Sequence, residues 1–196
     1  MSRIKNNENI QIIPLQIGHI LEVKSILDNQ FGFDYISVNE LKNKLNNPNN
    51  LCLVAKKGTE ILGISVAIIG KSDELSHHLL EKKDWFINEF KDKKLIGVRK
   101  QMAVKKTYQG KGVGTQLMNE SIHILNKTCD VIVTIVWNQG DSQIMEKLMK
   151  KNQFRPILLI ANYWKNDSIK MKYNCSVCQI IPCTCSATIY RRDNFK

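Results

Sequence analysis

The chain has 196 residues, 43% of them hydrophobic and 24% charged, which suits a single domain over residues 1–196 with a sizeable core. No apolar run reaches the ~20 residues that span a bilayer, and segment 1–9 lacks a signal peptide's apolar core, so we expect a cytoplasmic protein with no membrane partner. The net charge of +11 comes mainly from dispersed lysines, which favours a solvated basic surface over a nucleic-acid site.

Hydrophobic spacing along the chain predicts alternating strands and helices. Up to residue 104, the expected elements are a strand (10–15), two helices (17–29 and 38–45) and three strands (51–56, 60–69 and 95–104). Beyond it we expect a helix (115–125), a strand (130–137), a helix (141–151) and two final strands (154–164 and 187–192). The predicted order is β-α-α-β-β-β-α-β-α-β-β.

The segment after the 95–104 strand carries the most informative pattern of the chain. Glycine stands at every second position, at Gly110, Gly112 and Gly114. Without a Cβ, glycine permits unusual φ values, so successive N–H groups can turn around an anion, and the following helix adds unpaired N–H groups and its dipole. A P-loop is excluded because Gly110-Lys111 is followed by Gly112, and the dinucleotide fingerprint lacks its third glycine at Thr115. We call residues 109–115 the glycine loop.

The pattern Gln109-x-x-Gly112-x-Gly114 follows the strand end Met102-Ala103-Val104 by five residues. It resembles the pyrophosphate-binding motif of the GNAT superfamily of acetyl-CoA-dependent N-acetyltransferases. The resemblance covers residues 10–192 and leaves two insertions, at 71–94 and 165–186. It implies a mixed α/β (α+β) fold, with a twisted sheet of about seven strands and helices on both faces.

The resemblance also implies a cosubstrate and a reaction. Acetyl-CoA would lie beside the strand end and place its pyrophosphate on the N–H groups of the glycine loop. The expected cofactor-binding residues are Met102, Ala103, Val104, Gln109, Gly110, Lys111, Gly112, Val113, Gly114 and Thr115. The acetyl group would pass to an amine by direct attack in a ternary complex, with a strand N–H near Met102 polarising the thioester carbonyl.

The usual acid and base of the family do not carry over to this chain. The positions where relatives often place a glutamate base read Val98, Gln101 and Trp137. Met149 stands where a tyrosine often acts as general acid, and Ser142 replaces a frequent asparagine. The sequence therefore leaves the general base and the general acid open.

One candidate catalytic residue remains on the acceptor side. Asn162-Tyr163-Trp164 resembles the Asn-Tyr-Tyr element of protein N-terminal acetyltransferases of the ribosomal-protein alanine type, where tyrosines contact the acceptor peptide. Tyr163 would position the amine or donate a proton to the departing thiolate. The alternative is an aromatic pair that closes the end of the core. The acceptor itself, a protein N-terminus or a small-molecule amine, stays open.

Apolar residues in the 71–94 insertion predict an amphipathic helix. It could form a lid or wall of the acceptor pocket, cover the sheet edge or make a homodimer contact.

Four of the six cysteines fall within eleven residues, in the pattern Cys175-x-x-Cys178-x4-Cys183-x-Cys185. In a cytoplasmic protein this crowding favours a metal site, and four thiolates give zinc its tetrahedral shell. All four positions would be used for ligation, so we predict a structural zinc. Free thiols and a redox-sensing pair are the alternatives.

Two other functions remain open. The missing acid and base allow a non-catalytic acyl-CoA-binding module of the same fold. The net charge and the cysteines allow a zinc-knuckle nucleic-acid-binding protein, although Tyr190-Arg191-Arg192 is the single arginine-aromatic run near the cysteines.

Overall fold

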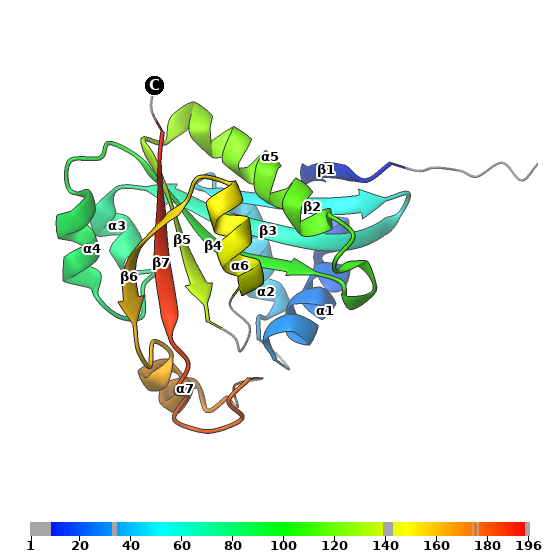
Figure 1. The fold of residues 1–196 in the computed structure, drawn as a ribbon. Helices are drawn as coiled ribbons and strands as arrows, with labels where there is room; N and C mark the ends of the chain where they lie inside the picture. The colour runs from blue at the N-terminus through cyan, green and yellow to red at the C-terminus, as the bar shows by residue number, and fades with distance from the viewer. Residues whose placement is uncertain (1–8, 33–34, 139–142, 174, 176, 195–196) are drawn as a thin grey trace, which may run out of the picture.

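The computed structural model describes residues 9–32, 35–138, 143–173, 175 and 177–194. Seven strands form one sheet in the order β1-β2-β3-β4-β5-β7-β6, which confirms the predicted mixed α/β architecture (Figure 1). The strands are β1 (Gln11–Pro14), β2 (Asn50–Lys57), β3 (Glu60–Gly70), β4 (Ile96–Val104), β5 (Val131–Trp137), β6 (Arg155–Ile160) and β7 (Ala187–Asp193). The α-helices are α1 (Ile20–Phe31), α2 (Val38–Asn46), α3 (Ser72–Ser76), α4 (Lys83–Phe90), α5 (Val113–Thr128), α6 (Gln143–Lys151) and α7 (Lys165–Met171). Two short 3₁₀ helices are η1 (Ile17–His19) and η2 (Lys106–Tyr108).

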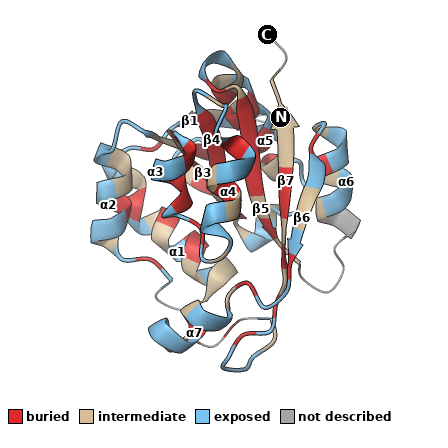
Figure 2. Ribbon diagram, turned by 90° about the vertical axis from the view of Figure 1, so that its left-hand side faces the viewer, coloured by how far each residue is buried: buried red, intermediate tan, exposed pale blue. Residues whose placement is uncertain are grey.

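Helices cover both faces of the sheet, so the central strands are buried on both sides (Figure 2). In β2, Cys52 and Val54 pack in the cluster with α1 and α2, whereas Leu53 and Ala55 pack in the cluster with α5. Alternate side chains of a strand point to opposite faces, which is why this strand reads as an unbroken apolar run. We call the two sides the α1–α4 face and the α5–α6 face.

Most neighbouring strands are antiparallel, and β4 and β5 are the parallel pair. A parallel connection needs a crossover, and α5 supplies it. The final strand, β7, inserts between β5 and β6 and pairs with both in antiparallel register.

The 71–94 insertion contains two short helices, α3 and α4, instead of the single amphipathic helix that the sequence predicts. The chain breaks between them, and Lys82 adopts the left-handed conformation with φ of 62°. Most apolar side chains of the insertion are nevertheless buried, in a core cluster with β3, β4, β5 and β7. The four fully buried ones are Leu75, Leu79, Phe86 and Phe90. The insertion therefore covers the α1–α4 face of the sheet.

The strand expected over 154–164 is shorter than predicted, because β6 ends at Ile160. A turn follows, in which Asn162 has φ of 54°, a conformation that asparagine tolerates better than most residues. Tyr163 thus lies in this turn and not on a strand. Among the described residues, no helix is both long and apolar enough to cross a bilayer.

Candidate functional site

The glycine loop lies between η2 and α5, as its sequence predicts. Gly110 and Gly112 have φ of 72° and 83°, values at which side chains are strained, and a Cβ added to either would meet nothing within 4 Å. Gly114 lies in the first turn of α5, where its missing Cβ would stand 3.6 Å from Val104 Cγ2. The two left-handed glycines thus border open space, while a side chain at Gly114 would make ordinary van der Waals contact with the end of β4.

The N-terminus of α5 presents free backbone donors beside this loop. The helical hydrogen bonds begin with Gln116 N–H, which donates to Gly112 O at 3.0 Å. The N–H groups of Val113, Gly114 and Thr115 come before that bond and so have no partner within the helix. A 16-residue helix adds the positive end of its dipole at the same place. Together these features favour a bound anion.

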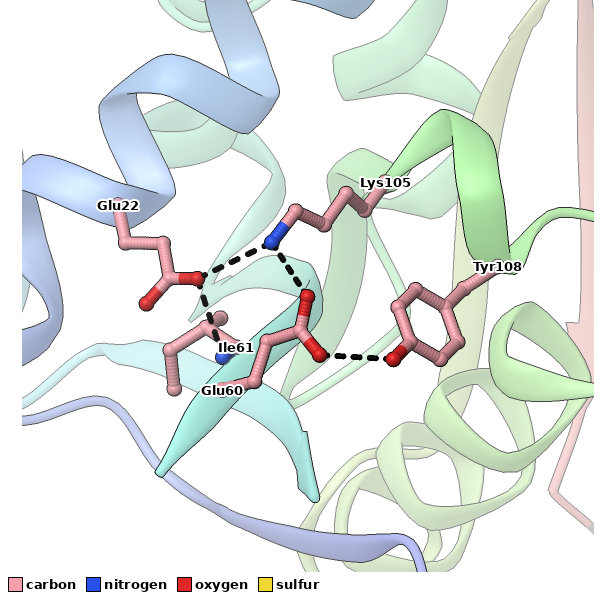
Figure 3. Close-up of polar contacts among 5 residues, drawn as sticks. All are labelled: Glu22, Glu60, Ile61, Lys105 and Tyr108. Atoms are coloured by element: carbon pink, nitrogen blue, oxygen red, sulfur yellow. Dashed lines mark hydrogen bonds and ion pairs between the residues drawn. The ribbon is translucent and has the colours of Figure 1, made fainter. Parts of the chain in front are cut away.

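A partly buried polar network links the chain just before the glycine loop to β3 and α1 (Figure 3). Lys105 Nζ lies 2.6 Å from Glu60 Oε1 and 3.4 Å from Glu22 Oε1, and Tyr108 Oη donates to Glu60 Oε2 at 2.7 Å. The hydrogen bond from Lys105, followed by that from Tyr108, lowers the pKa of Glu60. Next to it, Gln109 Nε2 donates to Val104 O at 3.0 Å. The network fixes the loop to β3, α1 and the end of β4.

An open depression of about 610 Å³ adjoins the glycine loop on the side of β1 and β2. Its lining residues are Asn9, Ile10, Lys57, Tyr108, Lys111 and Gln116. Neither β5 nor α6 contributes to it, so it could hold only a part of a ligand that extends away from the β4–β5 pair. Its two lysines suit a negatively charged group.

The strands β4 and β5 separate next to the loop. Their pairing runs from Ile96 opposite Val131 to Arg99 opposite Thr134, and no register pair follows. Strand β4 continues to Val104, while β5 goes on beside β7 to Trp137. On this side of β4, residues 100–104 therefore have no strand partner in the described part of the chain. The expected cofactor residues Met102, Ala103 and Val104 all lie in this free edge.

A bulge in β4 stands at the point of separation. Opposite β3, Gln101 pairs with Val66 and Arg99 pairs with Ala67, so Lys100 is the extra residue. Lys100 Nζ donates to the carbonyl oxygen of His78, which follows α3, and Gln101 Nε2 donates to Tyr35 Oη at 2.9 Å. The bulge thus brings two consecutive side chains to the α1–α4 face, where the sequence alone would place them on opposite faces.

Lys100 has the ionisation behaviour of a candidate base. Burial, followed by the nearby positive charge of Lys44, lowers the pKa of Lys100 to about 8, while Asp167 opposes the shift. Its amine is therefore partly neutral near pH 7–8, unlike that of an exposed lysine. Sequence reasoning missed this residue, because a bulge depends on strand register and leaves no local signal.

Tyr163 lies on the same face, deep in the core. Its side chain is 3% exposed, and its Oη accepts the backbone N–H of Leu80 at 3.2 Å. Its ring packs edge-on against Trp164, with centroids 4.9 Å apart. Burial raises the pKa of Tyr163, so the hydroxyl stays protonated at neutral pH. Segment 77–81 of the insertion therefore touches both Lys100 and Tyr163.

The other residues at positions where relatives carry catalytic groups contribute to packing. Val98 and Met149 are buried in the core, and Trp137 packs beside Trp164, with ring centroids 5.6 Å apart. Ser142 lies outside the described residues.

The α5–α6 face carries a buried cation beside the free edge of β4. Arg99 is 4% exposed, and its guanidinium reaches only two sulfur atoms among the described residues, Met102 Sδ at 3.5 Å and Met118 Sδ at 3.7 Å. Within the described part of the chain, its Nε has no hydrogen-bond partner. Burial lowers the pKa of Arg99 to about 10. A carbonyl oxygen or an anion of a bound ligand would satisfy this group.

The four clustered cysteines come together, as predicted. The Sγ atoms of Cys175, Cys178, Cys183 and Cys185 all lie within 4.8 Å of one another. The cluster lies between α7 and the start of β7, apart from the glycine loop.

Comparison with known proteins places these features in a family. Residues 48–156 match a family model described as "Acetyltransferase (GNAT) domain". Among curated proteins, none matches the sequence. Similar solved structures include NAA60 of Arabidopsis thaliana with acetyl-CoA, at 15% identity and a TM-score of 0.68, covering 94% of this chain and 98% of that one.

Two further solved structures share the fold at similarly low sequence identity. The ribosomal-protein-S18-alanine N-acetyltransferase of Escherichia coli is 12% identical, with a TM-score of 0.66 and 96% of each chain covered. Ard1 of Thermoplasma volcanium is 13% identical, with a TM-score of 0.64, covering 95% of this chain and 99% of that one.

Proposed function

The chain belongs to the GNAT acetyltransferase family, and we propose on this basis that it transfers an acetyl group from acetyl-CoA to an amine. One observation carries the proposal: β4 and β5 separate after Arg99, and the free edge of β4 that results leads to the glycine loop. The free edge and the loop together offer backbone donors along a line from the sheet to the N-terminus of α5. An extended ligand with amides at one end and phosphates at the other has the matching chemistry.

In this proposal the pyrophosphate rests on the N–H groups of residues 110–115, and Thr115 can add its hydroxyl. The pantetheine amides pair with the free edge of Met102, Ala103 and Val104, although the Val104 carbonyl oxygen already accepts from Gln109. Arg99 can donate to a carbonyl oxygen of the cofactor on the α5–α6 face. Lys57 and Lys111 then face the phosphate end of the ligand.

The chemistry requires a group that takes a proton from the attacking amine. Lys100 is our candidate for this base, since it lies where the strands separate and its pKa of about 8 leaves part of it neutral. The amine attacks the thioester carbon, and a backbone N–H of the free edge stabilises the oxyanion. Tyr163 is the candidate that protonates the departing thiolate, because its oxygen accepts the Leu80 N–H and its O–H has no acceptor among the residues that the structure describes.

The acceptor would approach from the α1–α4 face, where Tyr35, His78, Lys100 and Tyr163 gather. Peptide N-termini are the first acceptors to test, because one similar structure is named as an alanine N-acetyltransferase of a ribosomal protein. Small amines form the second class.

A panel of peptides and small amines, each incubated with the protein and acetyl-CoA, tests the function. We expect at least one acceptor to gain an acetyl group by mass spectrometry, with stoichiometric release of free CoA thiol and no product in heat-denatured samples. Binding of acetyl-CoA without turnover on any acceptor would instead favour a non-catalytic acyl-CoA-binding module.

A further inference from the structure

The cysteine cluster has the dimensions of a tetrahedral metal site. Cys175 Sγ lies 3.6 Å from Cys185 Sγ, and Cys178 Sγ lies 3.7 Å from Cys183 Sγ. A zinc–sulfur bond of ~2.3 Å in a regular tetrahedron places neighbouring sulfurs about 3.8 Å apart. A disulfide needs a sulfur–sulfur distance of ~2.05 Å, so none of these pairs is bonded. The four thiols leave a space between them that fits one ion.

The backbone around the cluster donates to sulfur. The N–H groups of Val177 and Cys178 each point to Cys175 Sγ at 3.4 Å. The chain then reverses at Gln179, which has φ of 55° and donates its N–H to Cys175 O at 3.0 Å. Backbone donors of this kind stabilise a thiolate more than a neutral thiol, because they compensate its negative charge.

The site is closed by protein. Cys175, Cys183 and Cys185 are buried, Cys178 is partly buried, and Trp137 and Trp164 pack against the group. Four protein ligands fill a tetrahedral shell and leave no position for water or substrate, which distinguishes a structural site from a catalytic one. Soft thiolate ligands exclude magnesium and calcium and select zinc or iron.

We propose that Cys175, Cys178, Cys183 and Cys185 bind one structural zinc ion. The ion holds together segments that border the α1–α4 face. Cys183 N–H donates to Ser168 Oγ of α7 at 2.8 Å, and Tyr163 N–H donates to Cys185 O at 3.0 Å. Through these bonds the zinc fixes α7, the turn that carries Tyr163 and the beginning of β7. This proposal stands apart from the acetyl transfer, since no step of the reaction uses the ion.

Metal analysis of the full chain, purified under reducing conditions without chelator, tests the proposal. We expect one zinc per chain by plasma mass spectrometry. Cobalt reconstitution should give the intense visible bands of a tetrahedral site and sulfur-to-cobalt charge transfer. Thiol titration of the folded chain should show little reaction at first, since Cys52 and Cys129 are buried as well, and a chelator should make the four cluster thiols reactive.

Two matched variants separate the site from the remaining thiols. Cys178→Ser alters the least buried ligand and should abolish stoichiometric zinc and lower Tm. Cys52→Ser alters a thiol outside the cluster and should retain one zinc per chain. Absence of zinc from zinc-replete wild-type protein would overturn the proposal. So would iron in its place, two disulfides by mass spectrometry, or full zinc occupancy in both Cys178→Ser and Cys185→Ser.

Discussion

Lys100 combines three properties of a general base: a pKa lowered to about 8, a place where β4 leaves β5, and an amine held by the His78 carbonyl oxygen. Its neutral fraction rises as the pH increases through 8. We therefore predict that kcat/KM rises with pH along a limb with an apparent pKa near 8 and then levels off. Changing to a less basic acceptor amine should leave this limb in place, because it belongs to the enzyme.

Replacing Lys100 by methionine removes the proposed base and keeps most of the length of the side chain. We predict a loss of about 10²–10⁴ in kcat/KM and the disappearance of the limb near pH 8, with little change in acetyl-CoA affinity. The folded pKa lies below that of an unfolded lysine, so charging Lys100 disfavours folding in full below pH 8 and to a decreasing extent up to pH 10.5, and Lys100→Met should not lower Tm. Lys91→Met, at an exposed lysine, is the control. Equal pH profiles for the two variants would refute the role of Lys100.

Some of these residues could be predicted from the sequence and others could not. Gly110 and Gly112 could be predicted, because a positive φ is a local requirement that selects glycine. Lys100 could not, because its orientation depends on the register of β4 against β3. The four cysteines stand between these cases: their spacing predicted proximity, and the folded loop between α7 and β7 supplies the distances.

Helices α3 and α4 pack as a fixed part of the α1–α4 face. Phe86 is 0% exposed and contacts Phe90, with ring centroids 4.9 Å apart. We predict that Phe86→Ala lowers the free energy of unfolding by about 3–5 kcal/mol in denaturant titration. Leu80→Ala is the matched control, because Leu80 is 39% exposed and its backbone N–H, which binds Tyr163, is kept in the variant. This variant should change the free energy of unfolding by less than about 1 kcal/mol. Similar small losses in both variants would indicate an insertion that does not belong to the core.

The strands and helices with strong periodicity are those that the sequence predicts well. Strands β2, β3 and β5 read as apolar runs because both of their faces are buried, and α5 has a clear apolar stripe. The insertion was predicted less well, because its buried residues are split between two helices by the turn at Lys82. The prediction that the strand reaches residue 164 was wrong, because the apolar and aromatic residues after Ile160 lie in a turn and pack into the core from there.

Across the molecule, the two faces of the sheet have different chemistry. The α5–α6 face carries the glycine loop and Arg99, which suits a polyanionic cofactor, while the α1–α4 face carries Lys100 and Tyr163. The β4–β5 separation connects them. The net charge and the cysteines motivated the nucleic-acid alternative, and the arginines of β7, the single arginine-aromatic run near the cysteines, are engaged within the fold. Arg191 contacts Asp193 and Glu89, and Arg192 contacts Asn126 and the Asn152 carbonyl oxygen.

The measurement that tests the account most directly is a calorimetric titration with acetyl-CoA of the wild-type protein, Gly112→Asp and Gly112→Asn. Asp and Asn tolerate the left-handed conformation similarly, so both variants carry the same backbone strain, but only Asp adds a negative charge beside the pyrophosphate. We predict one saturable site per chain in the wild type and an affinity at least about tenfold lower for Gly112→Asp than for Gly112→Asn. Wild-type protein that binds no acetyl-CoA, or equal affinities in the two variants, would contradict the placement of the cofactor on the glycine loop.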